Sequence, residues 1–393
     1  MMKILLVLPR FDRRKFDALT SQAWQIARRL TASGQAQCII AAGRSEDEAA
    51  LEVIENVPIH RFLPAPYRWK FWQNIFRREH GANDDILPGL EVFLRKKHFD
   101  LVHLMCGGRL CEYSAKILQE CQTRYVISCL PARGAGGTDM TGGSVHLNME
   151  TLTNAQRIFC RDHRQRRKLA AKLGDRRLVY WMPGVEFDRF SRPQTVDFRQ
   201  FYKISPQRTV ILSVGRISRS RNQKILLEML SVLNSRNRNC QLVIIGWSED
   251  DAYKAEFLKM AAERKLSNAV TCIEGLPPGD ERFPAAFQAA SLVMLPALDE
   301  ASATAVLEAW TAGVPVVTSP VGSGGELIED KVNGRIANPR NFQAWVQCCE
   351  ELLDERNRSA LEKMRSNGMI KARSLQWPKR IEDLLKIYEE SIL

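Results

Sequence analysis

Long apolar runs are missing from this sequence of 393 residues. No stretch approaches the roughly 18 uncharged apolar residues that a membrane-spanning helix needs. The first apolar run, residues 4–8, is followed at once by charged residues, beginning with Arg10. A signal peptide needs a longer apolar core and small residues at a cleavage site. We therefore expect the chain to stay in the cytoplasm.

Metal and redox signatures built on paired cysteines are also absent. The ten cysteines form no C-x-x-C pair, so neither a zinc ribbon nor a thioredoxin-like motif is indicated. Several cysteines, such as Cys38 and Cys272, lie in apolar runs. We expect them to be reduced, buried thiols.

Acidic residues are scarce in the first half of the chain. Residues 1–190 carry 30 Lys and Arg against 20 Asp and Glu, whereas residues 191–393 carry 27 against 25. The first half is therefore suited to an anionic partner. Nucleic acid is disfavoured, because the sequence has no RNA-binding signature and no helix-turn-helix pattern. An anionic membrane surface fits the charge better.

One segment, which runs from Tyr67 to Arg78 (YRWKFWQNIFRR), mixes aromatic with cationic side chains. Aromatic rings favour the headgroup level of a bilayer, and Lys and Arg pair with anionic lipids. The segment would attach the chain peripherally to the inner face of the cytoplasmic membrane. The alternative is a loop and short helix packed on the domain's own core, and the sequence leaves both readings open.

Short apolar runs alternate with helical patterns along the chain. Buried strands are predicted at residues 3–8, 38–42, 100–104, 125–129, 157–160 and 179–182, and a second series at 209–214, 241–245, 270–273, 292–295 and 315–318. Two consecutive β/α series predict an α/β fold of two Rossmann-like parallel-sheet domains that face each other across a cleft. We expect these domains over residues 1–190 and 191–375, with a final amphipathic helix over 376–393. Ligands of such folds bind at the carboxyl ends of the strands.

The sharpest group of polar residues follows the strand that ends at Leu295. A loop carries Glu300, and a helix is expected to begin near Ser302, Ala303 and Thr304, where free N–H groups would suit a diphosphate. Glu308 lies further along this apolar helix, where a carboxylate is costly unless it binds something, such as a ribose diol. The alternative is that Glu300 and Glu308 are ordinary solvated charges.

A second group of residues follows the strand at 209–214. Gly215 allows a sharp turn of the backbone, and Arg216 and Arg221 bring guanidinium groups to the expected cleft. Guanidinium donors match phosphate oxygens in geometry. No Walker motif is present, so this is not a P-loop. A solvated basic loop is the alternative.

Together these motifs resemble the retaining glycosyltransferases of family four, the group 1 type, which have the GT-B fold. The resemblance rests on VGR with RN at residues 214–222, on E-x7-E at 300–308 and on GVPVV at 313–317. It extends to PGVE at 183–186, LPP at 276–278, GSGGELI at 322–328 and NG at 333–334, and to the helix that ends the chain. It covers residues 150–393 well and the first 150 weakly.

The resemblance implies a metal-independent, retaining transfer of a sugar from a nucleotide diphospho-sugar, with no cofactor, to a hydroxyl of a glycan or lipid-linked acceptor. Arg216, Arg221 and Glu300 would be the catalytic residues. The donor would be bound by Gly215, Pro277, Ser302, Ala303, Thr304 and Glu308. The acidic run at residues 249–251 lacks the D-x-D setting of metal-dependent transferases, so no metal ligands are expected.

The first domain departs from the family pattern. The loop at residues 10–18 has no glycine, and no histidine follows the strand at 125–129. The loop after that strand carries Arg133, Gly136 and Gly137, which could contact an acceptor or a phosphate, as could His103 at another strand end. These departures leave two rivals open, a sugar-nucleotide epimerase with the GT-B fold and a non-catalytic nucleotide-sugar binder.

Overall fold

The computed structural model describes residues 1–12, 17–44, 48–66, 85–128, 147–300 and 302–393. The aromatic and cationic segment from Tyr67 to Arg78 and the loop with Arg133, Gly136 and Gly137 lie outside these residues. The described chain divides into two compact units. Unit 1 comprises Met1–Trp181 together with Arg380–Leu393, and unit 2 comprises Met182–Lys379.

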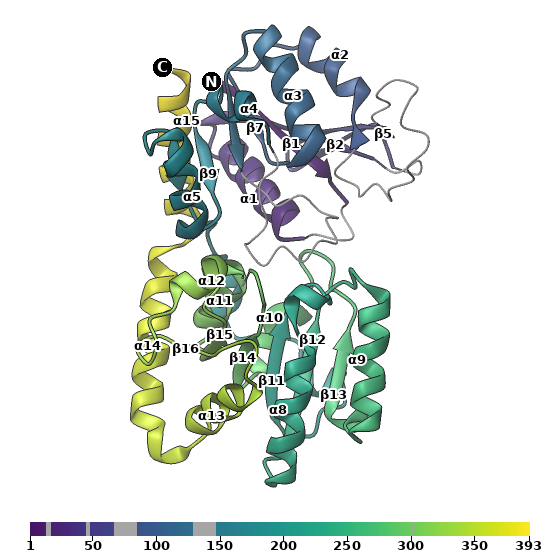
Figure 1. The fold of residues 1–393 in the computed structure, drawn as a ribbon, viewed down its shortest axis with the longest axis vertical. Helices are drawn as coiled ribbons and strands as arrows, with labels where there is room; N and C mark the ends of the chain where they lie inside the picture. Colours follow the sequence, from purple (N-terminus) through teal and green to yellow (C-terminus); the bar gives the residue numbers. More distant parts are fainter. Residues whose placement is uncertain (13–16, 45–47, 67–84, 129–146, 301) are drawn as a thin grey trace. The chain divides into compact units, whose positions relative to one another are not determined.

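Unit 1 is built on an eight-stranded sheet (Figure 1). Across the sheet the strands are, in order, β10 (Leu178–Tyr180), β9 (Ile158–Cys160), β8 (Tyr125–Ser128), β7 (Leu101–Leu104), β1 (Met2–Arg10), β2 (Ala36–Gly43), β4 (Val57–Phe62) and β3 (Leu51–Ile54). All neighbours pair in parallel except β3, which is antiparallel to β4. Short strands β5 (Ala65–Pro66) and β6 (Asp85–Ile86) form a separate pair. Parallel strands joined by helices confirm the predicted fold class of this half.

The helices of unit 1 are α1 (Ala18–Ala32), α2 (Pro88–Lys96), α3 (Gly108–Glu120), α4 (Met149–Thr153), α5 (His163–Leu173) and most of α15 (Trp377–Ile392). Helix α1 begins after Asp17, whose carboxylate accepts a hydrogen bond from Thr20 N at 2.8 Å. The described helices contain none with both the length and the apolar composition to cross a bilayer.

Unit 2 is built on a six-stranded parallel sheet. The strands are, in order, β13 (Val270–Ile273), β12 (Cys240–Ile245), β11 (Thr209–Val214), β14 (Leu292–Leu295), β15 (Val316–Thr318) and β16 (Arg335–Ile336). The helices are α6 (Phe187–Ser191), α7 (Phe198–Phe201), η1 (Arg219–Arg221), α8 (Lys224–Ser235), α9 (Asp251–Glu263), η2 (Ser267–Ala269), α10 (Arg282–Ala289), α11 (Ala303–Thr311), α12 (Gly322–Leu327), α13 (Phe342–Leu352), η3 (Glu355–Asn357) and α14 (Arg358–Ser374).

Apolar clusters cover both faces of the unit 2 sheet. Ile211 of β11 belongs to one cluster, and its neighbours Val210 and Leu212 belong to the other. Successive side chains of a strand point to opposite faces, so a strand buried on both sides must be apolar throughout. This explains why the apolar runs at 209–214, 270–273 and 292–295 in the sequence coincide with β11, β13 and β14.

The boundary between the units falls earlier than residue 190, where the sequence placed it. Residues after Trp181 pair with the end of α14 and the start of α15, since Val185 N donates to Leu375 O at 3.0 Å and Trp377 N to Val185 O at 3.4 Å. Gly184 is needed here, because a Cβ at this position would lie 2.7 Å from the Trp377 backbone. The segment from Met182 onward therefore belongs to unit 2.

Helix α15 packs on the core of unit 1 through Tyr388, which is fully buried. The Tyr388 hydroxyl is hydrogen-bonded to His103 Nδ1 at 2.6 Å, and His103 Nε2 to Ser128 Oγ at 2.8 Å. The His103 ring stacks on Phe159, and burial lowers the pKa of His103 to about 3. The expected contact of His103 with an acceptor or phosphate is therefore wrong. One ring nitrogen bonds α15 and the other bonds β8, and the imidazole is neutral.

The cysteines that the structure describes are free thiols. Seven of them are buried, and Cys121 and Cys272 are partly exposed. Burial raises the pKa of the Cys38 and Cys160 thiols to about 12. These thiols are protonated and unreactive, as the sequence indicated.

Candidate donor site in unit 2

The chain of unit 2 reverses direction across the sheet between β11 and β14. From β11 it proceeds to β12 and β13 on one side, and then returns to β14 on the other. The loops after β11 and β14 therefore leave the sheet at neighbouring points of its carboxyl edge, where the chain turns to opposite sides. Ligands of open α/β sheets bind at this kind of switch point. The two motif groups of the sequence follow these two strands.

The loop after β11 turns sharply at Gly215, whose φ is +140°, a conformation that favours glycine. Gly246, after β12, lies against this turn, and a Cβ on Gly246 would come within 1.8 Å of Gly215 O. Ile217 forms a bridge with Ser248 beside it. Two glycines thus allow the loops after β11 and β12 to lie in contact.

The loops after β11 and β14 are joined by Arg221. One guanidinium nitrogen of Arg221 donates to the carbonyl of Glu300, and Leu298 N donates to Ser220 O at 2.8 Å. Arg216 and Glu300 are both close enough to act electrostatically on the Arg221 side chain. The structure thus places Arg216, Arg221 and Glu300 close to one another.

Arg221 also presents an unused donor. Its Nε is buried and has no hydrogen-bond partner among the described residues, and burial lowers the pKa of its guanidinium. Gln223 Oε1 and Ser248 Oγ, from the same loops, are buried without partners as well. Buried polar atoms without partners are rare, and each calls for an explanation. A bound anion would supply acceptors for Arg221 Nε.

The other cations of the loop are already paired. Arg216 Nη1 lies 2.5 Å from Glu249 Oε1. Arg219 pairs with Glu256 at 2.7 Å, and Lys224 pairs with the same carboxylate. Sequence reasoning missed this role of Glu249 and assessed it only as a metal ligand. In the described residues, no group of three or more His, Cys, Asp or Glu side chains could hold a metal ion.

Helix α11 begins at the far side of the switch point. Ser302 is its N-cap residue, but its side chain makes no capping hydrogen bond. The first amides of a helix lack intrahelical acceptors, so those of Ala303 and Thr304 are available to a ligand. Ala303 is buried, whereas Ser302 and Thr304 are partly exposed. The neighbouring residue 301 lies outside the described part.

Glu308 lies one and a half turns further along α11 and is partly exposed. Desolvation raises the pKa of Glu308 to about 8, opposed by Arg189 and reinforced by Glu186. Arg189 also donates to Asp280 O at 3.0 Å, in the loop that follows β13 and carries the exposed Pro277. Glu308 is thus tied electrostatically to α6 and to this loop, and sequence reasoning missed Glu186 and Arg189 as its neighbours.

The family model of the glycosyl transferases group 1 matches residues 195–371. These residues are similar to the group 1 glycosyl transferases. The family resemblance stated from the sequence is confirmed. The matched range contains all the residues of the donor site described above, from Gly215 to Glu308.

Curated relatives align with about half of this chain. A D-inositol 3-phosphate glycosyltransferase of Salinispora tropica is 27% identical over 225 residues, which cover 53% of this chain and 45% of that protein. A lipopolysaccharide 1,2-N-acetylglucosaminetransferase of Salmonella typhimurium is 26% identical over 210 residues, which cover 52% and 53%. The chain therefore spans about half the length of the curated relatives it matches.

Solved structures resemble the whole chain. Sucrose-phosphate synthase from Thermosynechococcus elongatus has a TM-score of 0.77 at 16% identity, over 99% of this chain and 98% of that one. Anabaena HepE, in complex with UDP and glucose, has a TM-score of 0.75 at 15% identity, over 98% and 99%. Likeness at this level of identity establishes the fold, which is GT-B, as the sequence predicted.

Proposed function

We propose that this protein is a glycosyltransferase that moves a sugar, with retention of its anomeric configuration, from a nucleotide diphospho-sugar to an acceptor hydroxyl. The observation that carries the proposal is the buried, unpartnered Nε of Arg221 beside Arg216 and the start of α11. Guanidinium groups and helix amides are the donors that a diphosphate uses.

The leaving diphosphate is where negative charge develops during transfer. Arg216 and Arg221 would neutralise this charge, and the amides near Ser302 and Thr304 would support it. No cationic side chain other than Arg216 and Arg221 is needed in the donor site to neutralise this charge. Preorganised donors of this kind typically contribute about 3 kcal/mol each to transition-state stabilisation. Glu300 would position the donor sugar, and Glu308 would bind the ribose hydroxyls.

Similar proteins support a nucleotide-sugar donor and a glycan or lipid-linked acceptor. Among similar proteins are HepE, solved with UDP and glucose, and WaaG, a glycosyltransferase involved in lipopolysaccharide biosynthesis. We propose a UDP- or GDP-sugar as donor and a glycan or lipid-linked acceptor, acted on in the cytoplasm or at the inner face of its membrane.

The test is release of nucleoside diphosphate from a panel of UDP-, GDP- and ADP-sugars by the full chain, with and without candidate acceptors. A transferase hydrolyses its donor slowly and releases diphosphate faster with acceptor. Exchange between sugar isomers without release would instead indicate an epimerase, and binding without either reaction a non-catalytic binder. Both of these outcomes contradict the proposal.

A matched pair of variants tests the site. Arg216→Ala should lower turnover about 100-fold, the effect of losing one transition-state donor. Arg219→Ala, three residues away, removes a guanidinium that pairs with Glu256 and Asp250 instead, and should leave turnover near that of the wild type. Equal effects of the two substitutions would contradict the assignment of Arg216.

A further inference from the structure

Helix α5 of unit 1 has an outer face made of cations. Arg164, Arg167, Lys168 and Lys172 are exposed, and Arg167 and Lys168 lie three and four residues after Arg164, with Lys172 four residues after Lys168. Residues at this spacing lie on one side of a helix. Leu169, Ala170 and Leu173 occupy the other side and pack against the core of unit 1. We name the four cationic residues the α5 stripe.

The charge around the α5 stripe is concentrated. Residues 161–177 contain eight Lys and Arg and only two acidic residues, a net charge of +6 out of +12 for the whole chain. Half of the chain's excess positive charge therefore lies within 17 residues. This excess creates a local positive potential that attracts anions.

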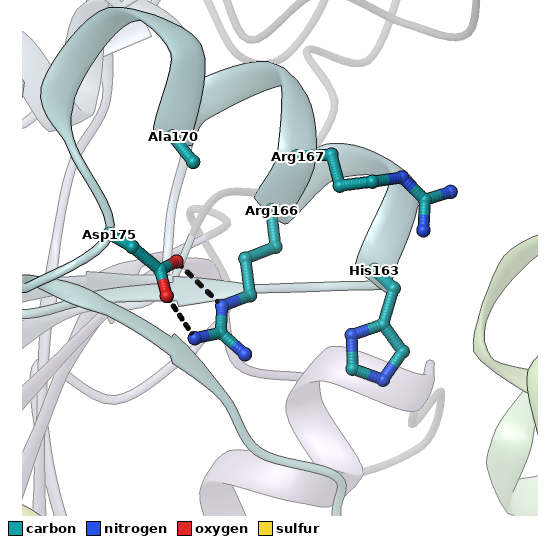
Figure 2. Close-up of a pocket in the computed structure, with 5 residues that line it drawn as sticks. All are labelled: His163, Arg166, Arg167, Ala170 and Asp175. Atoms are coloured by element: carbon teal, nitrogen blue, oxygen red, sulfur yellow. Dashed lines mark hydrogen bonds and ion pairs between the residues drawn. The ribbon is translucent and has the colours of Figure 1, made fainter.

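Both acidic residues of this segment are already engaged. Asp162 accepts from Gln165 N at 2.6 Å and pairs with Arg161 at 3.1 Å. Asp175 receives two hydrogen bonds from Arg166, at 2.9 and 2.5 Å (Figure 2). The side chains of Arg164, Arg167, Lys172 and Arg176 form no hydrogen bond or ion pair with any described residue. Their charges are left for a partner outside the molecule.

A hollow of about 330 Å³ lies beside the stripe, lined by His163, Arg166, Arg167, Ala170 and Asp175. Figure 2 shows the Arg166 guanidinium turned toward Asp175, while the Arg167 guanidinium points away from this ion pair. A phosphate group lying in the hollow would meet Arg167 and His163 without having to separate Arg166 from Asp175.

We propose that the α5 stripe is a docking surface for an anionic lipid bilayer, held by headgroup phosphates and carboxylates. A helix that lies flat presents its four cations to a planar surface at once. The stripe has no aromatic residue to stack on bases, which favours a lipid surface over a single-stranded nucleic acid. The surface belongs to unit 1 and the donor residues belong to unit 2, so the docking and the proposed transferase activity can fail separately.

The test is sedimentation of the full chain with vesicles of phosphatidylcholine, alone or with 30 mol% phosphatidylglycerol, at low and high salt. Each Lys or Arg near an anionic surface raises binding about fivefold, so four side chains together account for more than a hundredfold. We expect binding to the anionic vesicles only, and its loss in 0.5 M salt, since the attraction is screened.

The decisive variant is Arg164→Gln, Arg167→Gln, Lys168→Gln, Lys172→Gln, in which glutamine preserves helix propensity. We expect vesicle binding to fall more than a hundredfold, with the thermal transition and UDP binding unchanged. The matched control removes four exposed cations of unit 2 by Arg238→Gln, Lys259→Gln, Lys363→Gln and Lys379→Gln, and should change vesicle binding less than tenfold.

Three outcomes would overturn the proposal. They are a wild-type chain that does not bind anionic vesicles, a stripe variant that binds as well as the wild type, and a control that loses as much binding as the stripe variant. A separate binding experiment uses poly-uridine RNA as a probe in place of the vesicles. Tight binding to RNA without vesicle binding would identify the stripe as a nucleic-acid surface instead.

Discussion

Arg216 and Glu249 form an ion pair across the loops that follow β11 and β12, with Arg216 Nη1 2.5 Å from Glu249 Oε1. The guanidinium that we assign to the donor diphosphate therefore already has an anionic partner. Both side chains are about one-third exposed. A diphosphate must replace Glu249, or share Arg216 with it, in order to bind.

The first prediction is that Glu249→Gln increases the affinity for UDP. Exposed ion pairs contribute up to about 1 kcal/mol, so the gain should be between about two- and fivefold. Titration calorimetry of both chains with UDP measures it. Asp251→Asn, which neutralises an exposed carboxylate two residues away, is the control and should leave affinity unchanged. A loss of affinity in Glu249→Gln would mean that Glu249 orients Arg216 rather than competing for it.

The second prediction concerns Arg221, whose Nε is buried without a partner. Arg221→Met should weaken UDP binding by about 10- to 100-fold, since a charge-assisted hydrogen bond is worth about 1.5–3 kcal/mol. Arg221→Lys keeps the charge and should recover most of the affinity. The free energy of unfolding should fall by about 0.5–1.5 kcal/mol, because the substitution also removes the hydrogen bond from Arg221 to the Glu300 carbonyl. Strong destabilisation by Arg221→Met, with UDP affinity intact, would make Arg221 a structural residue.

The third prediction is a pH dependence of stability from Glu308. The pKa of Glu308 is raised from 4.5 to about 8, so the folded state favours the protonated carboxyl. The unfolded chain ionises near pH 4.5, and stability is therefore lost progressively as the pH rises from about 4.5 to about 8. Glu308→Gln removes this loss, and its melting temperature should exceed that of the wild type at pH 8–9 but match it near pH 4.5.

Melting curves between pH 4.5 and 9 test this prediction, with Glu389→Gln, an exposed carboxylate of α15, as the control. A difference between Glu308→Gln and the wild type that is the same at every pH would contradict it. The same variant should bind UDP less tightly, because the ribose would lose an ionisable acceptor. Stability and donor binding would then change in opposite directions.

The fourth prediction concerns the attachment of α15. Tyr388→Phe removes the hydroxyl that bonds His103 and leaves Nδ1 of that buried ring without its partner. This should cost about 1–3 kcal/mol and increase amide hydrogen exchange in α15. UDP binding should not change, since the donor residues lie in unit 2. Unchanged exchange in α15 would mean that apolar packing alone holds the helix.

The buried strands of unit 2 could be predicted because they are continuous apolar runs between glycine, proline and polar residues. β11, β13 and β14 coincide with their predicted limits, and α11 begins at Ala303, within the expected range. The clustering of the proposed donor residues could be predicted from the same strands. These residues follow strand ends directly, and parallel strands bring those ends to one edge.

The hairpin of β3 and β4 gave no recognisable signal. Its turn residues, Glu55 and Asn56, have φ values of +45° and +63°, conformations that usually require Asn-Gly or Gly-Gly. Contacts that depend on the tertiary fold were also beyond sequence reasoning. His103 and Tyr388 are 285 positions apart, and only the docking of α15 turns a candidate ligand-binding histidine into a buried one.

The central claim is that a nucleoside diphosphate binds between the loop after β11 and the start of α11. A crystal structure of the chain with UDP measures this directly. The account predicts phosphate oxygens within hydrogen-bond distance of Arg221 Nε and the Arg216 guanidinium, and the ribose hydroxyls at Glu308. A diphosphate bound elsewhere, with Arg216 still on Glu249 and Arg221 Nε still without an acceptor, would contradict it.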